Sequence, residues 1–191
     1  YQLLTQGLKR PVRDTQSIER IIKGAENLQT FLETNAEAAL QFENISVDTL
    51  FFSESNAQWK RIADIRWEGH KVLKQIGPLW KESLVLAIAE QYDRTEAVEQ
   101  YEQWITWMVD RLHLDQALSI EPLLNGSQIQ QRVLPYARDE AFKQIMEAQE
   151  EWQVRHGYAA RADNNHEARL IAHLRDAFPE FAGHCEGEDG V

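Results

Sequence analysis

The sequence predicts an all-α fold, a compact multi-helix bundle that forms a body with a smaller helical tail. Three observations favour this class. Apolar residues recur at three- and four-residue steps almost from end to end, and no stretch of strand length alternates apolar with polar residues. The chain also has no repeat with a period of about 20 to 50 residues, so a compact bundle is favoured over a solenoid.

The first helix is expected after Asp14 and Thr15, because both residue types can cap a helix. Its apolar stripe, interrupted only off the face by Gly24, consists of Ile18, Ile21, Ile22, Ala25, Leu28 and Leu32. A second, shorter helix is expected to open at Thr34, since Thr34 and Glu37 have the spacing of a capping box.

Residues 44–55 lack the helical pattern, and the apolar cluster at 50–52 is expected to be a loop pinned to the core. The next predicted helix, residues 57–76, has two distinct faces when each residue advances by about 100°. Gly77 suits a left-handed helix end and Pro78 suits the first position of a helix, so this pair predicts a tight corner. Opposite the apolar face, the helix presents Lys60, Asp64, Trp67, Lys71 and Lys74.

Two more helices complete the body. The helix after the corner is expected to bury Trp80, Leu84, Ala87, Ile88 and Gln91. The helix at 95–112 leaves Trp107 off its apolar stripe, which consists of Tyr101, Trp104, Ile105, Met108 and Leu112. A turn-rich connector at 121–127 follows, so we expect a helical body at 1–118 and a helical tail at 119–182.

In the tail, Ser127 is expected to cap a short helix that ends at Leu134. A longer helix beyond Pro135 is expected to end at Gly157. Its inner face consists of Phe142, Ile145, Met146, Gln149, Trp152 and Gln153.

The last helix is expected to begin with Asn164 and Glu167, which again have the spacing of a capping box, and to stop at Pro179. Beyond it, residues 183–191 are short and acidic. They are predicted to form a flexible C-terminus.

Composition limits the classes of function. Lys and Arg number 20 against 31 Asp and Glu, and the formal net charge is −11, so any contact with nucleic acid must be local. A single Cys cannot form an internal disulfide, and no stretch is apolar and long enough to cross a membrane. We therefore expect a soluble intracellular protein, with the compartment left open. Because Tyr1 stands in place of an initiator Met, we expect a piece of a longer chain.

No catalytic motif is found. The sequence lacks a Gly-rich phosphate loop, the paired carboxylates of two-metal nucleotidyl transfer, and a nucleophile with a neighbouring base, so a self-contained hydrolase is disfavoured. His166 and Glu167 begin like a zinc-protease helix, but Leu170 stands where the second His is required. We expect His166 and His173 to be exposed, and we predict no catalytic residue and no metal ligand.

Short segments of the body and tail carry a resemblance to a known family. Residues 76–84 read IGPLWKESL, residues 122–129 read PLLNGSQI, and residues 145–153 read IMEAQEEWQ. They resemble the C-terminal body and tail of eukaryotic-type tRNA nucleotidyltransferases, the CCA-adding enzymes, and the likeness extends over about residues 15–180. It implies that this chain holds the tRNA elbow and T arm and orients the 3′ end. The catalytic head, which uses Mg²⁺ with CTP and ATP, would then lie N-terminal to it.

Two basic clusters are the candidate RNA contacts, because lysines and arginines bind phosphates and an aromatic ring can stack on a ribose or base. The first cluster consists of Lys60, Arg61, Trp67, Lys71 and Lys74, with His70 at its edge. Where the family has a Gly-rich turn between the tail helices, this chain has residues 133–138. The second cluster is Arg132, Arg138 and Lys143. Their side chains would contact the phosphates in place of the backbone of that Gly-rich turn.

Two alternatives stay open. The lysines near Trp67 would look the same if they were merely solvated and the indole packed on a neighbouring helix. The chain would alternatively be an acidic helical module that docks a protein partner. Trp67 and Trp107 would then be its anchors, since exposed Trp commonly marks a binding hot spot.

Overall fold

A computed structural model of the chain describes residues 12–41, 56–91, 93–137, 139–157 and 164–182. These residues are helical and contain no strand, which confirms the predicted all-α class. The chain divides into two compact units, Tyr1–Ser119 and Ile120–Val191, here called the first and second unit. The predicted loop at 44–55 and the predicted acidic terminus at 183–191 lie outside the described residues.

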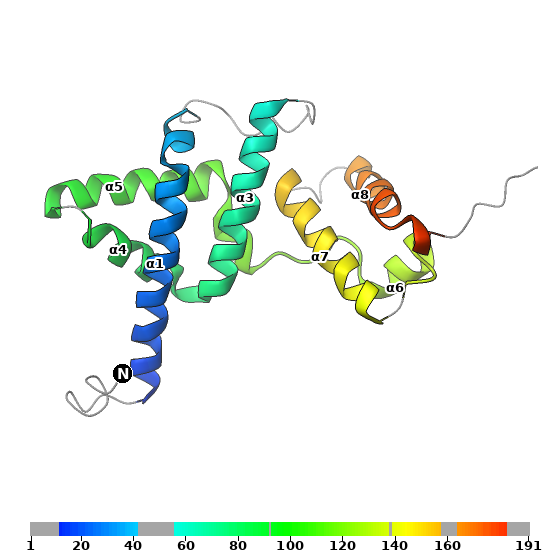
Figure 1. Cartoon of the computed structure of the whole chain (residues 1–191), viewed down its shortest axis with the longest axis horizontal. Helices are drawn as coiled ribbons and strands as arrows, with labels where there is room; N and C mark the ends of the chain where they lie inside the picture. Colours follow the sequence, from blue (N-terminus) through cyan, green and yellow to red (C-terminus); the bar gives the residue numbers. More distant parts are fainter. Residues whose placement is uncertain (1–11, 42–55, 92, 138, 158–163, 183–191) are drawn as a thin grey trace, which may run out of the picture. The chain divides into compact units, whose positions relative to one another are not determined.

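The first unit is built on long helices (Figure 1). In chain order these are α1 (Val12–Gln41), α3 (Ala57–Ile76), α4 (Trp80–Ala89) and α5 (Arg94–Thr106). Shorter turns connect or follow them, namely the 3₁₀ helix η2 (Gly77–Leu79), the π-helix η3 (Trp107–Arg111) and the 3₁₀ helix η4 (Leu114–Leu118). Helices α1 and α3 lie side by side, and α4 packs across α1.

Helix α1 is one continuous helix of 30 residues, whereas the sequence predicted a break at Thr34. The Thr34 hydroxyl does not cap a new helix, because its Oγ1 donates to the Thr30 carbonyl oxygen at 2.7 Å, one turn earlier. The buried stripe also continues through Leu32 to Ala38. Packing of an amphipathic face stabilises a helix more than local propensity does, so the predicted second helix was wrong.

Gly24 lies on the inner face of α1, which corrects its expected off-face position. A Cβ atom at Gly24 would come 2.9 Å from Ile76 Cγ2 and 3.0 Å from Ser83 Cβ. Only a hydrogen atom therefore lets α1 approach α4 this closely. Further along, Gln91 Nε2 donates to Glu33 Oε1 at 3.0 Å, and Gln91 is exposed rather than buried as predicted. The other predicted inner residues of α4 are buried: Trp80, Leu84, Ala87 and Ile88.

Helix α3 has the bounds predicted for it. Its start is capped by Asn56, whose Oδ1 accepts from the Gln58 N–H at 2.8 Å. Gly77 ends it with a φ of 77°, and Pro78 lies in η2, which confirms the predicted corner. The predicted apolar face is turned into the core, with Val72 half-buried and the others buried: Ile62, Ile65, Gly69, Leu73 and Ile76.

The helix predicted at 95–112 is α5 followed by the π-helix η3. In a π-helix an N–H donates to the carbonyl five residues back, as Leu112 does to Trp107 at 3.0 Å, so each residue turns through a smaller angle. The inner face of the helix shifts accordingly, and Trp107 is buried with 6% exposure. The centroid of its ring lies 6.1 Å from that of Phe31 and 5.4 Å from that of Trp104. The predicted off-stripe position of Trp107 was wrong. The predicted stripe is half-buried or buried: Tyr101, Trp104, Ile105, Met108 and Leu112.

The second unit consists of α6 (Gly126–Gln128), the π-helix η5 (Ile129–Val133), α7 (Asp139–His156), α8 (Asn164–Ala177) and the 3₁₀ helix η7 (Pro179–Phe181). Gly157, with a φ of 105°, follows α7, and Pro179 follows α8 closely, so both predicted helix ends are confirmed. The buried core is Leu124, Ile129, Val133, Leu134, Ala137, Ile145, Trp152, Leu170 and Leu174.

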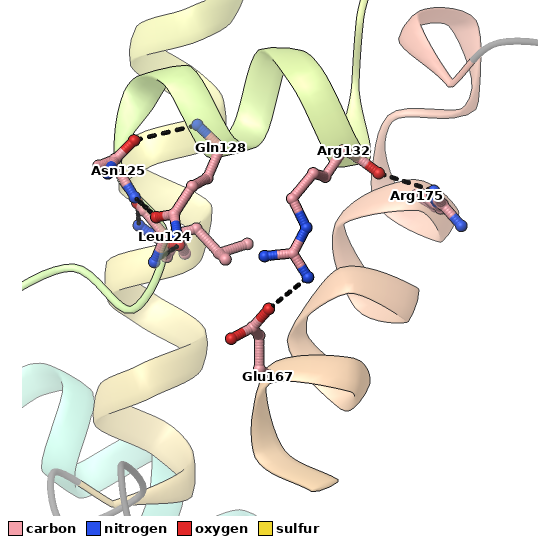
Figure 2. Close-up of polar contacts among 7 residues, drawn as sticks. Leu124, Asn125, Gln128, Arg132, Glu167 and Arg175 are labelled. Atoms are coloured by element: carbon pink, nitrogen blue, oxygen red, sulfur yellow. Dashed lines mark hydrogen bonds and ion pairs between the residues drawn. The ribbon is translucent and has the colours of Figure 1, made fainter. Parts of the chain in front are cut away.

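The cap of α6 is Asn125 and not Ser127. Asn125 Oδ1 accepts from the Gln128 N–H at 3.0 Å, and Gln128 Oε1 accepts from the Asn125 N–H at 2.8 Å (Figure 2). These reciprocal bonds form a capping box, which satisfies two backbone donors at the helix start. The helix therefore begins before Ser127, the residue predicted to cap it.

Candidate nucleic-acid interface

The first predicted RNA-binding cluster lies entirely on α3 and points away from the core. Lys60, Arg61, Lys71 and Lys74 are exposed, and Trp67 is half-buried. At 1.5 Å per residue, Lys60 and Lys74 are separated by about 21 Å along the helix axis. We call these five residues the α3 basic face.

The indole of Trp67 is held by two residues one turn further along α3. The rings of Trp67 and His70 are stacked, with centroids 5.5 Å apart and an interplanar angle of 14°. Lys71 Nζ lies 5.4 Å from the centroid of the Trp67 ring, a cation–π arrangement. His70 is buried with 1% exposure, so it supports the indole from within and does not lie at the edge of the basic face as predicted.

Two carboxylates lie beside the basic side chains. Asp64 and Glu68 are exposed on α3, within one helical turn of Lys60 and Lys71 respectively. Four positive side chains still outnumber these two negative ones. The α3 basic face is therefore a local exception to the overall charge of −11.

The residues of the second predicted cluster have different environments. Arg132 is committed to α8, since its Nη2 lies 2.7 Å from Glu167 Oε1 and its carbonyl oxygen accepts from Arg175 Nη2 at 2.8 Å (Figure 2). Lys143 is exposed on α7, and Arg138 lies outside the described residues. Arg132 thus fastens η5 to α8, a structural role that the sequence did not predict.

Two buried glutamines of α7 hold the backbone of the segment Glu121–Leu124, from here on called the connector. Gln149 Oε1 accepts from the Leu124 N–H at 3.1 Å, and its Nε2 donates to the Leu124 carbonyl at 3.0 Å. Gln153 does the same one turn later, accepting from the Leu123 N–H at 3.1 Å and donating to the Glu121 carbonyl at 3.1 Å. The sequence signal for this role was two amides four residues apart on an otherwise apolar helix face.

Arg66 is a further residue that sequence reasoning missed. Its side chain is fully buried in α3, and its Nε donates to the Leu112 carbonyl oxygen at 3.1 Å. The bond joins residues that are 46 positions apart, and it ties α3 to the end of the π-helix η3. Arg66 therefore helps to fix the helix that carries the basic face.

His166 is buried with 7% exposure, which corrects its predicted exposure, whereas His173 is exposed as predicted. In the described part of the chain, no group of three or more His, Cys, Asp or Glu residues is placed to hold a metal ion. None of the helices described there is both long and apolar enough to cross a lipid bilayer.

Chemically, the α3 basic face offers ammonium and guanidinium donors for phosphates and a flat ring for a ribose or base. The two predicted clusters lie in different units. Comparison with known proteins finds no match to any family model, curated protein or solved structure.

Proposed function

We propose that the chain is the tRNA-binding C-terminal part of a CCA-adding tRNA nucleotidyltransferase. It holds the elbow and T arm of the tRNA and orients the 3′ end. An N-terminal catalytic head of the same polypeptide adds CMP and AMP from CTP and ATP with Mg²⁺. The residues of this chain contribute binding and orientation, and no catalytic step is assigned to them.

The observation that supports this proposal best is the contact between two segments that carry the family resemblance. PLLNGSQI supplies Leu123 and Leu124, and IMEAQEEWQ supplies Gln149 and Gln153. Four hydrogen bonds join the glutamine amides to the backbone of the connector. The two glutamines of the second segment therefore hold the backbone of the first segment in place, which is the packing that the proposal expects of the tail.

The RNA contact itself is assigned to the α3 basic face. A chain with a charge of −11 repels a polyanion over most of its surface, so binding needs a local cluster of cations. Lys60, Lys71 and Lys74 are exposed on one face of α3, with Trp67 among them. In the second unit, we assign the candidate RNA contact to exposed Lys143, because Arg132 is already paired with Glu167.

The test is a fluorescence titration of the full chain with tRNA at two or more salt concentrations. Lys71→Glu with Lys74→Glu is expected to weaken binding and to reduce the slope of log affinity against log salt by about one for each lysine. The matched control is Lys23→Glu with Lys81→Glu, two exposed lysines on α1 and α4 that give the same total charge change. It should leave the salt slope nearly unchanged.

Equal and negligible affinity for tRNA and for an unrelated acidic polymer would contradict the proposal. The alternative of a protein-docking module loses one of its two anchors, because Trp107 is buried against Phe31 and Trp104. Its remaining anchor, Trp67, is shared with the RNA proposal. If Trp67→Ala leaves the tRNA affinity unchanged, the indole is not part of the RNA-binding surface.

A further inference from the structure

The indole of Trp67 has a neighbour on each side, which limits what the ring can bind. His70 and Lys71 follow it on α3, and around the helix they lie about 60° to one side of it and about 40° to the other. The centroids of the Trp67 and His70 rings are 5.5 Å apart, and Lys71 Nζ lies 5.4 Å from the indole centroid. Side chains of α3 itself therefore flank the ring.

The contact between Trp67 and His70 is fixed from within the fold. The two rings are nearly parallel, with an interplanar angle of 14°. His70 is 1% exposed and Trp67 is half-buried, so a nucleobase would have to displace a core side chain to take the place of His70. Because packed interiors resist such displacement, the side of the indole that His70 covers is closed to a ligand.

The contact between Trp67 and Lys71 lies at the surface. Lys71 is exposed, and its ammonium forms no ion pair with any carboxylate in the described part of the chain, although Glu68 is only three residues away. An ammonium has three N–H donors, and those that do not face the ring stay available to an anion. A lysine that is already held in place also loses less side-chain freedom when it binds.

We propose that Trp67 is a positioning residue of the α3 basic face. Its indole, supported by His70, holds the Lys71 ammonium ready for a phosphate oxygen, and the indole itself does not stack on a base. This inference rests on the proposed function, because it concerns the same RNA-binding surface. The α3 basic face then recognises a phosphodiester backbone by its charge and not by the identity of its bases.

A double-mutant cycle in the full chain tests the positioning role. Trp67→Leu should weaken tRNA binding about two- to five-fold, the size of an exposed cation–π contact, and Trp67→Phe should restore most of the affinity. In the background of Lys71→Gln, Trp67→Leu should have no further effect, because the lysine that it positions is gone. A stacked base would instead cost about 5- to 150-fold. A loss that persists without Lys71 would overturn the proposal.

Lys60 provides the matched control. It is exposed on the same helix, seven residues before Trp67, and it makes no contact with the indole. The effects of Lys60→Gln and Trp67→Leu should therefore add. A single-stranded RNA and its abasic counterpart of equal length give a second comparison. Trp67→Leu should weaken both by the same factor, whereas a loss confined to the RNA with bases would assign the ring to stacking.

An NMR measurement reads the contact directly. The Lys71 ε-methylene protons, assigned by their absence in Lys71→Gln, should resonate upfield of those of other lysines because of the indole ring current. Trp67→Leu should abolish this shift, and saturation with tRNA should preserve it. A shift that disappears on binding would mean that Lys71 leaves the ring, and it would overturn the proposal.

The failure of this inference is distinguishable from the failure of the proposed function. If the chain does not bind tRNA, the proposed function fails, and inorganic polyphosphate replaces tRNA as the probe. Polyphosphate has no bases, so Trp67→Leu should still weaken its binding about two- to five-fold in the presence of Lys71. Polyphosphate that binds equally well to the wild type and to Trp67→Leu would contradict the positioning role.

Discussion

The hydrogen bonds of Gln149 lead to a sharp prediction about stability. Gln149 is 1% exposed, and its amide pairs with both the N–H and the carbonyl of Leu124, which is 0% exposed. Met has nearly the same length and volume as Gln, so Gln149→Met keeps the packing but removes both bonds. Two backbone groups of Leu124 would then be buried without their partners.

The expected magnitude follows from these two groups. A buried donor or acceptor that loses its partner costs about 1–3 kcal/mol, so Gln149→Met, which leaves two such groups, should destabilise the second unit by roughly 2–6 kcal/mol. Gln153→Met is the matched control, because it also removes two bonds. Its partners are less buried, since Leu123 is half-buried and Glu121 is exposed. Water replaces the lost bonds there, and we expect a loss of about 1 kcal/mol.

Urea unfolding and amide exchange measure this difference. With a slope of about 1–3 kcal/mol per molar urea, Gln149→Met should lower the midpoint of the second unit by about 1 M or more. The Leu124 amide should lose its exchange protection in this variant and keep it in Gln153→Met. A Gln149→Met midpoint close to that of the wild type, or a larger loss in Gln153→Met, would refute the reasoning from burial.

Three further predictions test the fold. Gly24→Val should destabilise the first unit by roughly 1–3 kcal/mol through overpacking, and Ser83→Gly in the same chain should restore part of this loss in thermal unfolding. Trp107→Ala should cost about 3–5 kcal/mol in urea unfolding, because it leaves a cavity in the core; a loss under about 1 kcal/mol would mean that the ring is not buried. Asn125→Ala should cost about 1 kcal/mol through loss of the cap, measured in the same way, whereas Ser127→Ala should be close to neutral.

Strong local signals made some elements predictable from the sequence. The bounds of α3 followed from its periodicity, and its end followed from Gly77 and Pro78, whose backbone preferences need no information from the rest of the fold. The exposure of Lys60, Lys71 and Lys74 followed from the same periodicity. The basic face could therefore be recognised before the fold was known.

The errors have physical causes that a local pattern does not contain. Thr34 and Glu37 have the spacing of a capping box, but tertiary packing keeps α1 continuous through them. The π-helix η3 changes the angle per residue, and a count at 100° per residue then misplaces Trp107. Gly24 has no side chain to bury, so a search for apolar side chains misses its place at a helix crossing.

The candidate site was predictable only in part, because the partners of a side chain depend on contacts that are distant in sequence. Arg132 was predicted as an RNA contact from its charge, yet Glu167 and Arg175 of α8 engage it. The burial of His166 likewise depends on α7, which supplies Trp152.

The hydrogen bonds from Gln149 and Gln153 to the connector also determine which sequence changes the second unit tolerates. Both amides contact main-chain atoms, which every amino acid other than proline provides alike. The side chain of Pro122 is exposed and takes part in none of these four bonds, so it can be replaced. An insertion or deletion of one residue there would instead shift the backbone donors and acceptors of the connector relative to Gln149 and Gln153. The length of this stretch is therefore more constrained than its composition.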